Sequence, residues 1–229
     1  MLKVYRIDRS IFGKINNKFK KPDLPLATAS IGNPFKNYKD FKREGFYVLS
    51  DKTEIDRFVE AFGGSWQDDQ YYIRHPKETR TNVLVPASKF HKYIIREMIG
   101  DIIYYLRAHL NVKELDLSIK SIKTGSLSVK GVVEGLLLDG KTTLDLSSDY
   151  TVKIKCSAPL KPSEKKTEYI WINEFPHLIS LVDEAKNGIF SISESFDLSF
   201  GFDLKMAETI GASLDLSGNT QFNFVVTVD

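Results

Sequence analysis

The sequence has little cysteine and no long apolar run. Its 229 residues include one cysteine, Cys156, which excludes an internal disulfide framework and a multi-thiolate zinc site built by this chain alone. No window of the sequence approaches the roughly 20 consecutive apolar residues of a membrane-spanning helix, and the N-terminus lacks the apolar core of a signal peptide. We therefore expect a globular protein that works in the cytoplasm.

The sequence also lacks the local motifs of several enzyme classes. It contains no nucleophile elbow, no zinc-protease His-Glu-Xaa-Xaa-His and no dinucleotide glycine fingerprint. If His91 and His109 lie on one helix, their separation along its axis is about 27 Å, too far to share a metal ion. The sequence therefore predicts no catalytic residue, no cofactor and no metal site. An enzyme whose site is assembled from distant strands remains an alternative, because such a site leaves no local pattern.

Charge is distributed unevenly along the chain. Residues 1–113 carry 21 Lys and Arg against 13 Asp and Glu, whereas residues 114–229 carry 11 against 17, so the net charges are +8 and −6. All eight arginines lie at or before Arg107. This asymmetry indicates either two regions with different surfaces or one domain with a dipolar surface.

The basic half begins with a segment that shows no regular periodicity. Residues 1–45 hold 11 basic and 4 acidic residues with interspersed aromatics and prolines, which predicts a basic irregular arm. Residues 46–49 are typical of a short strand, and Ile55, Phe58, Val59 and Phe62 then share one face of an expected helix that ends at Gly63-Gly64. Two strands are expected at 66–75 and 81–85.

The longest predicted helix covers about residues 89–111. Its apolar residues occupy half of the helical circumference, as expected for a helix that packs broadly against a sheet. The opposite arc is mixed, with Tyr93, Arg96, Gly100, Asp101 and Arg107 expected to face outward. The pattern Tyr93-Xaa-Xaa-Arg96 recurs eleven residues later as Tyr104-Xaa-Xaa-Arg107. This arc is predicted either to bind a partner or to dock within the molecule.

From residue 114 the hydrophobic period changes to two, which is typical of antiparallel strands with one buried face. A strand is expected at 169–172 and a short helix from Pro176 to about Asn187. The alternation over 192–206 is interrupted at Glu194. The predicted fold class is α+β: a mixed N-terminal region with one long helix, followed by an antiparallel β-meander sheet interrupted by a short helix. The expected regions are 1–45, 46–113 and 114–229, the last two being either separate or one domain.

Three functions are compatible with these features. The first is a non-enzymatic binding or assembly protein whose basic half contacts a nucleic acid or an acidic protein subunit, including a second copy of this chain. The alternatives are a membrane-active, pore-forming effector that uses its amphipathic strands and an enzyme with a dispersed site. The residues predicted to bind the acidic partner are basic or aromatic: Lys14, Lys18, Lys20, Lys21, Arg74, Arg80, Lys92, Tyr93, Arg96, Tyr104 and Arg107.

Overall fold

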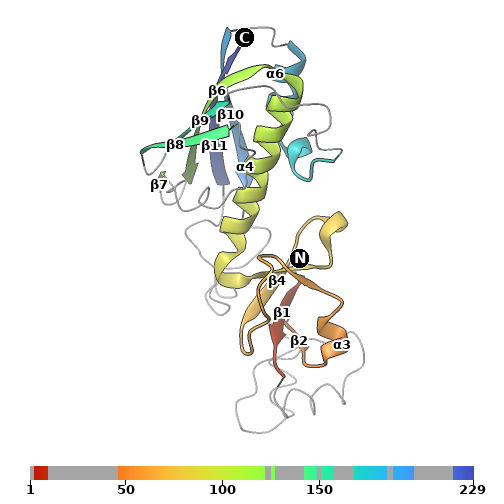
Figure 1. Ribbon diagram of the computed structural model, residues 1–229. Helices are drawn as coiled ribbons and strands as arrows, with labels where there is room; N and C mark the ends of the chain where they lie inside the picture. Colours follow the sequence, from red (N-terminus) through yellow and green to blue (C-terminus); the bar gives the residue numbers. More distant parts are fainter. Residues whose placement is uncertain are drawn as a thin grey trace. The chain divides into compact units, whose positions relative to one another are not determined.

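The computed structural model describes residues 3–9, 46–121, 125–126, 142–148, 151–156, 168–184, 188–198 and 219–229 (Figure 1). These residues form helices and two β-sheets, which confirms the predicted α+β class. They divide into two compact units between Phe90 and His91. The described part of the first unit is residues 3–9 and 46–90, and the second unit holds the described residues from His91 onward.

The first unit is built on a mixed sheet with the strand order β2-β1-β4-β5-β3. β1 (Val4–Ile7) pairs in parallel with β2 (Phe46–Leu49) and antiparallel with β4 (Tyr71–Arg74). The prediction of an irregular arm from residue 1 is therefore wrong for residues 4–7. Val4 and Ile7 are fully buried, so burial of two apolar side chains and pairing on both sides stabilise a strand too short to show periodicity.

The expected helix through Phe62 is also wrong, because α3 (Lys52–Ile55) is one turn long. Asp51 caps this turn by accepting a hydrogen bond from the Thr53 N–H. The chain then forms β3 (Val59–Glu60), in which the Val59 N–H donates to the Asn82 carbonyl over 2.8 Å. Pairing with β5 (Val83–Pro86) thus overrides the helical periodicity of this segment.

One hydrophobic cluster of the first unit lies on the sheet face against which Ile55 of α3 packs. Its buried residues include Tyr5, Ile7, Leu49, Ile55 and Tyr72, against which Tyr47, Phe58 and Trp66 pack. β4 lies within the strand that the sequence predicts for 66–75, and β5 overlaps the strand predicted for 81–85 and extends one residue beyond it. Two 3-10 turns, η1 (Glu78–Arg80) and η2 (Ala87–Lys89), follow β4 and β5.

The second unit combines the long helix with an antiparallel sheet, as predicted. α4 (Phe90–His109) lies against one sheet face (Figure 1). The strands are β6 (Val112–Ser121), β7 (Gly125–Ser126), β8 (Thr142–Ser148), β9 (Thr151–Cys156), β10 (Gly188–Asp197) and β11 (Asn219–Val228). Their order is β10-β11-β6-β9-β8, with β7 paired to β6.

The two-residue period of the sequence places apolar side chains between this sheet and α4. Leu115, Leu117 and Ile119 of β6 are buried, as are Phe222, Phe224 and Val226 of β11. The register sets Leu117 opposite Phe224 and Leu115 opposite Val226, so these residues share one face. On α4, Ile95, Ile99 and Ile102 are each at most 1% exposed, and burial of each such side chain contributes about 2 kcal/mol.

The segment before β10 differs in part from its prediction. Residues 169–172 do not form the expected strand; the chain is irregular there and enters η4 (Ile172–Glu174). The predicted short helix is α6 (Pro176–Glu184), which begins with proline at a position where no intrahelical N–H is needed. α6 packs against β10, so the inner face at this end of the sheet is covered by a second helix.

Candidate functional site

The structure separates the predicted binding residues into three groups. Lys14, Lys18, Lys20 and Lys21 lie outside the described residues. Arg74 and Arg80 belong to the first unit, where Arg74 Nε donates to the Thr81 carbonyl over 2.6 Å and the half-buried Arg80 ends the turn η1. Arg74 therefore stabilises the loop between β4 and β5. Its role in binding a partner remains a prediction.

The third group lies on α4. Lys92, Tyr93, Arg96 and Tyr104 are half-buried, and Arg107 is 3% exposed. The arc that the sequence predicts to face outward is therefore covered. Gly100 is buried and Asp101 is 1% exposed. This correction favours the second prediction for this arc, that it docks within the molecule.

Two carboxylates of α4 bind the irregular segment that precedes η4. Asp101 Oδ2 accepts hydrogen bonds from the Ile170 N–H over 2.6 Å and from the Trp171 N–H over 2.8 Å. One turn earlier, Glu97 Oε2 accepts from Trp171 Nε1 over 3.2 Å. These bonds satisfy backbone groups that have no strand partner, and they hold the fully buried Trp171 on the helix.

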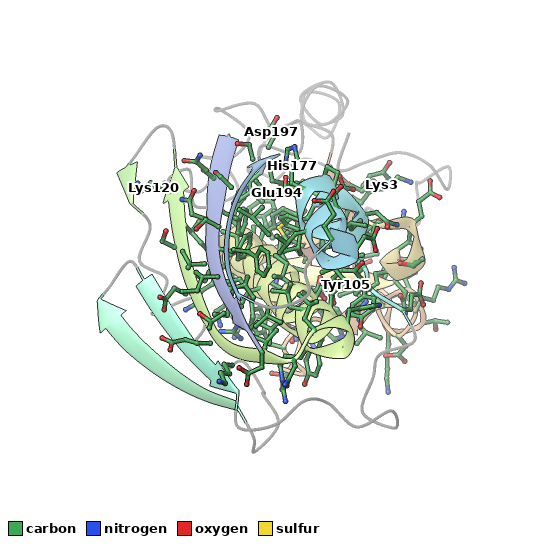
Figure 2. The ribbon with its side chains drawn as sticks, turned by 90° about the horizontal axis from the view of Figure 1, so that it is seen from above. Lys3, Tyr105, Lys120, His177, Glu194 and Asp197 are labelled. Atoms are coloured by element: carbon green, nitrogen blue, oxygen red, sulfur yellow. The ribbon has the colours of Figure 1, made fainter. Side chains whose placement is uncertain are left out.

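Tyr105 and His109 follow Glu97 and Asp101 on the same face of α4, at intervals of four residues. The Tyr105 ring lies 5.3 Å from the Tyr169 ring with an interplanar angle of 86°, and 4.4 Å from the His109 ring with an angle of 40°. His109 Nδ1 donates to the Tyr105 carbonyl over 2.9 Å. We name Tyr105, His109 and Tyr169 the aromatic cluster; Tyr105 is labelled in Figure 2.

Burial raises the pKa of both tyrosines in the aromatic cluster. A second contribution to the pKa of Tyr105 comes from the Asp183 carboxylate of α6, and Asp101 acts in the same direction on the pKa of Tyr169. Both carboxylates disfavour a negative charge on the phenol oxygens. Two carboxylates, those of Asp101 and Asp183, therefore act on the aromatic cluster.

A different pair lies at the start of α6, where β10 places Glu194 under the helix (Figure 2). Glu194 is 4% exposed; its Oε1 accepts from the Leu178 N–H over 2.9 Å, and its Oε2 lies 2.9 Å from His177 Nδ1. The His177 side chain is 75% exposed. A carboxylate that holds the orientation of an imidazole is typical of metal ligands and general bases. However, no group of three or more potential metal ligands occurs among the described residues.

The remaining histidines have structural surroundings. His75 is buried, and its Nδ1 accepts from the Lys77 N–H over 3.2 Å. His91 is 2% exposed and donates from Nε2 to the Leu198 carbonyl over 3.0 Å. Burial lowers the pKa of His91 to about 4, with the hydrogen bond acting in the opposite direction. His109 is exposed.

One sequence pattern depends on the structure for its interpretation. Residues 135–142 match the spacing of a phosphate-binding loop, in which two glycines precede Lys141 and Thr142. In that motif the lysine and threonine begin a helix. Here Thr142 begins strand β8, so the helix N-terminus that would bind phosphate does not follow the glycines. The match therefore supports no nucleotide site.

Sequence reasoning missed the roles of Asp101 and Glu194. The signal for Glu194 is its position between Ile192 and Phe196, where the alternation requires an inward side chain. The signal for Asp101 is its four-residue spacing from Glu97 at the border of the apolar arc. Neither signal identifies the backbone groups that these carboxylates bind, because those groups lie 69 and 16 residues away in sequence.

No helix in the described part of the chain has the length and apolar character needed to cross a membrane. No protein-family model matches the sequence, and comparison with curated proteins and with solved structures finds no significant match.

Proposed function

We propose that this protein is a non-enzymatic binding or assembly protein whose basic N-terminal half contacts an acidic partner. The observation that carries the proposal is the location of the basic excess. The described residues of the first unit carry nine basic and eight acidic groups, whereas residues 10–45 carry eight and three. Most of the +8 charge of residues 1–113 therefore lies in a segment that includes Lys14, Lys18, Lys20 and Lys21.

The described part of the first unit uses two of its arginines in internal ion pairs. Arg6 pairs with Asp69, and Arg9 pairs with Asp68 over 2.7 Å. These contacts connect β1 and the residues after it to the loop before β4. Positive charge that is neutralised in this way contributes little to the attraction of a partner, so the role in partner binding falls to residues 10–45.

A second copy of the chain offers an acidic partner. Residues 114–229 carry a net charge of −6, so the basic segment of one copy and the acidic half of another are complementary. Association in this arrangement is head-to-tail. A nucleic acid is the competing partner, because basic residues interleaved with aromatics also suit phosphates and stacked bases.

The test is the mass of the purified protein by light scattering at low and high salt, with absorbance recorded to detect nucleic acid. We expect a multimer that dissociates as salt screens the charges. The variant with Lys14, Lys18, Lys20 and Lys21 all changed to Gln should be monomeric. The matched control changes four exposed cations elsewhere, Lys52, Arg57, Lys89 and Lys120, to Gln and should retain the multimer.

The alternatives give different results in the same experiment. Nucleic acid that co-purifies and is lost in the quadruple lysine variant favours nucleic-acid binding over self-assembly. A monomer whose mass does not change with salt contradicts the proposal. Dye release from liposomes then tests the membrane-active alternative, and a ligand that stays bound through purification would favour an enzyme.

A further inference from the structure

The contacts on the polar face of α4 divide into two kinds. Glu97 and Asp101 are used by the fold, since they bind Trp171 and the backbone before it. Tyr105 and His109 continue the same face, but their polar tips are not used in this way. In the described structure the hydroxyl groups of Tyr105 and Tyr169 have no hydrogen-bond partner, and His109 uses only Nδ1. The aromatic cluster therefore presents polar groups that are available to a ligand.

The geometry of the rings limits how far the two tyrosines cover each other. In a perpendicular pair, one ring contributes an edge and the other a face, so the ring that contributes its edge keeps both of its faces clear of the other. If that ring is Tyr105, Tyr169 covers neither of its faces, and the His109 ring lies 4.4 Å from it. If it is Tyr169, neither of its faces is covered by Tyr105. Both tyrosines are only half-buried, so solvent reaches the cluster.

The charges around this cluster select the sign of a ligand. Asp183 acts on Tyr105 and Asp101 acts on Tyr169, and both effects come from negative groups. Asp183 lies on α6, is exposed and has no ion pair among the described residues. An anion, including a nucleic-acid phosphate, is repelled by these carboxylates, whereas a cation is attracted to them and to the aromatic face.

We propose that Tyr105, His109 and Tyr169, together with Asp183, form a docking site for a lysine side chain from residues 10–22 of a second copy of this chain. An ammonium group over a tyrosine face gains a cation–π interaction, and its N–H groups can donate to the phenol oxygens and to the carboxylate of Asp183. Residues 10–22 contain four lysines, two phenylalanines and no acidic residue. The choice of this occupant rests on the proposed function, whereas the preference of the site for a cation rests on its geometry and charge alone.

The test is titration of a synthetic peptide of residues 10–22 into the full-length variant in which Lys14, Lys18, Lys20 and Lys21 are changed to Gln. This variant removes competition from the protein's own lysines. Calorimetry measures the affinity, and NMR of the aromatic ring protons reports where the peptide binds. We expect saturable binding that shifts the Tyr105, His109 and Tyr169 ring signals and weakens with salt, and no binding by the same peptide with its four lysines changed to Gln.

Two positions outside the buried core test the site: the half-buried Tyr169 and the exposed Asp183. Tyr169→Leu should weaken the peptide about fivefold to tenfold, because it removes one ring of the cluster. Asp183→Asn should weaken it about threefold, whereas Asp197→Asn, a matched change of an exposed acid on β10, should leave the affinity unchanged. Equal affinities for Tyr169→Leu and the parent protein, or ring signals that do not move, would overturn this proposal.

The outcomes separate this inference from the proposed function. If the peptide binds at the aromatic cluster but the unmodified protein remains monomeric at every salt concentration, the cation site stands and self-assembly fails. If the unmodified protein forms a salt-sensitive multimer whose mass is unaffected by Tyr169→Leu, self-assembly stands and this docking site is wrong.

Discussion

The two units use charged side chains in different ways. In the first unit, Arg9 and Asp68 form an ion pair whose side chains are each about half exposed, at 49% and 51%. In the second unit, Asp101 and Glu194 are almost completely buried and accept backbone N–H groups from distant segments. Exposed pairs contribute little because water screens them, whereas a buried carboxylate with several donors stabilises the segments it connects.

This difference also explains where charge remains for a partner. In the first unit Arg6 and Arg9 are ion paired, and the described residues carry nine basic and eight acidic groups, so this part is close to neutral. In the second unit the buried carboxylates accept hydrogen bonds from N–H groups, which carry no compensating charge, and the carboxylates of Asp101 and Asp183 act on the aromatic cluster. The chain has two tryptophans, Trp66 in the first unit and Trp171 in the second, so fluorescence can follow each unit separately in Trp66→Phe and Trp171→Phe backgrounds.

The largest expected effect is that of Asp101→Ala. It removes the acceptor of two N–H groups, one of them fully buried with Trp171, and we expect the free energy of unfolding of the second unit to fall by about 3–4 kcal/mol. Urea unfolding followed by Trp171 fluorescence measures it in the Trp66→Phe background. Glu184→Ala, which removes an exposed acid at the end of α6, is the control and should change the stability little. Equal losses in the two variants would show that Asp101 does not anchor the segment.

The next effect is a dependence of stability on pH through His91. The pKa of His91 is about 4 in the folded protein and its ordinary value is 6.5, so between these values the unfolded chain binds a proton that the folded chain does not. His91 therefore costs no stability above pH 6.5, and the second unit loses up to about 3 kcal/mol as the pH falls toward 4.

The measurement for His91 is urea unfolding at pH 7 and pH 4.5, compared with the same series for His91→Gln. Glutamine can still donate a hydrogen bond to the Leu198 carbonyl but does not titrate. The difference between the two series isolates His91 from the carboxylates, which titrate in both proteins. Parallel pH profiles for the parent protein and His91→Gln would show that His91 takes up its proton equally in the folded and the unfolded state.

A smaller effect is expected for Glu194→Gln. Glutamine keeps one acceptor for the Leu178 N–H but loses the charge that pairs with His177, so we expect the second unit to be destabilised by about 1–2 kcal/mol. His177→Gln is the matched control, and it should cost less than about 0.5 kcal/mol because that side chain is largely exposed. If the two variants cost the same, the contact with His177 rather than the hydrogen bond from the Leu178 N–H is the stabilising contact of Glu194.

The smallest effect is expected for Asp68→Asn in the first unit. The pKa of Asp68 is lowered mainly by its hydrogen bond from Arg9, but the pair is half exposed, and we expect no measurable change in unfolding followed by Trp66 fluorescence. A loss as large as that of Glu194→Gln would contradict the comparison, since exposed pairs would then stabilise the first unit as strongly as a buried carboxylate stabilises the second.

The sequence predicts the elements whose pattern is long enough to be repeated. The apolar arc of the helix at 90–109 and the alternation along β6, β10 and β11 are each carried by many residues, and the structure confirms them. The failures are short: β1 has four residues, and the apolar spacing from Ile55 to Phe62 resembles a helix although Val59 pairs with β5. A single turn of helix and a two-residue strand have too few contacts of their own to determine their conformation.

The candidate site was less predictable than the fold. The sequence correctly predicts that the long helix carries Tyr93, Arg96, Tyr104 and Arg107. Its prediction that this arc faces outward is wrong. The aromatic cluster joins positions 105, 109 and 169, and the Glu194 pair joins β10 to the start of α6. Contacts between residues that are far apart in the chain leave no local pattern, so only chain packing reveals them.

The sequence alone determined the α+β class, the long helix, the antiparallel strands and the unequal distribution of charge, because these depend on residue periodicity and composition. The tertiary structure decided which charges are neutralised, which carboxylates are buried and which aromatic tips remain without a partner. The physical reason is that burial and hydrogen bonding depend on the surrounding chain, and the same carboxylate stabilises or repels according to the groups that packing brings to it.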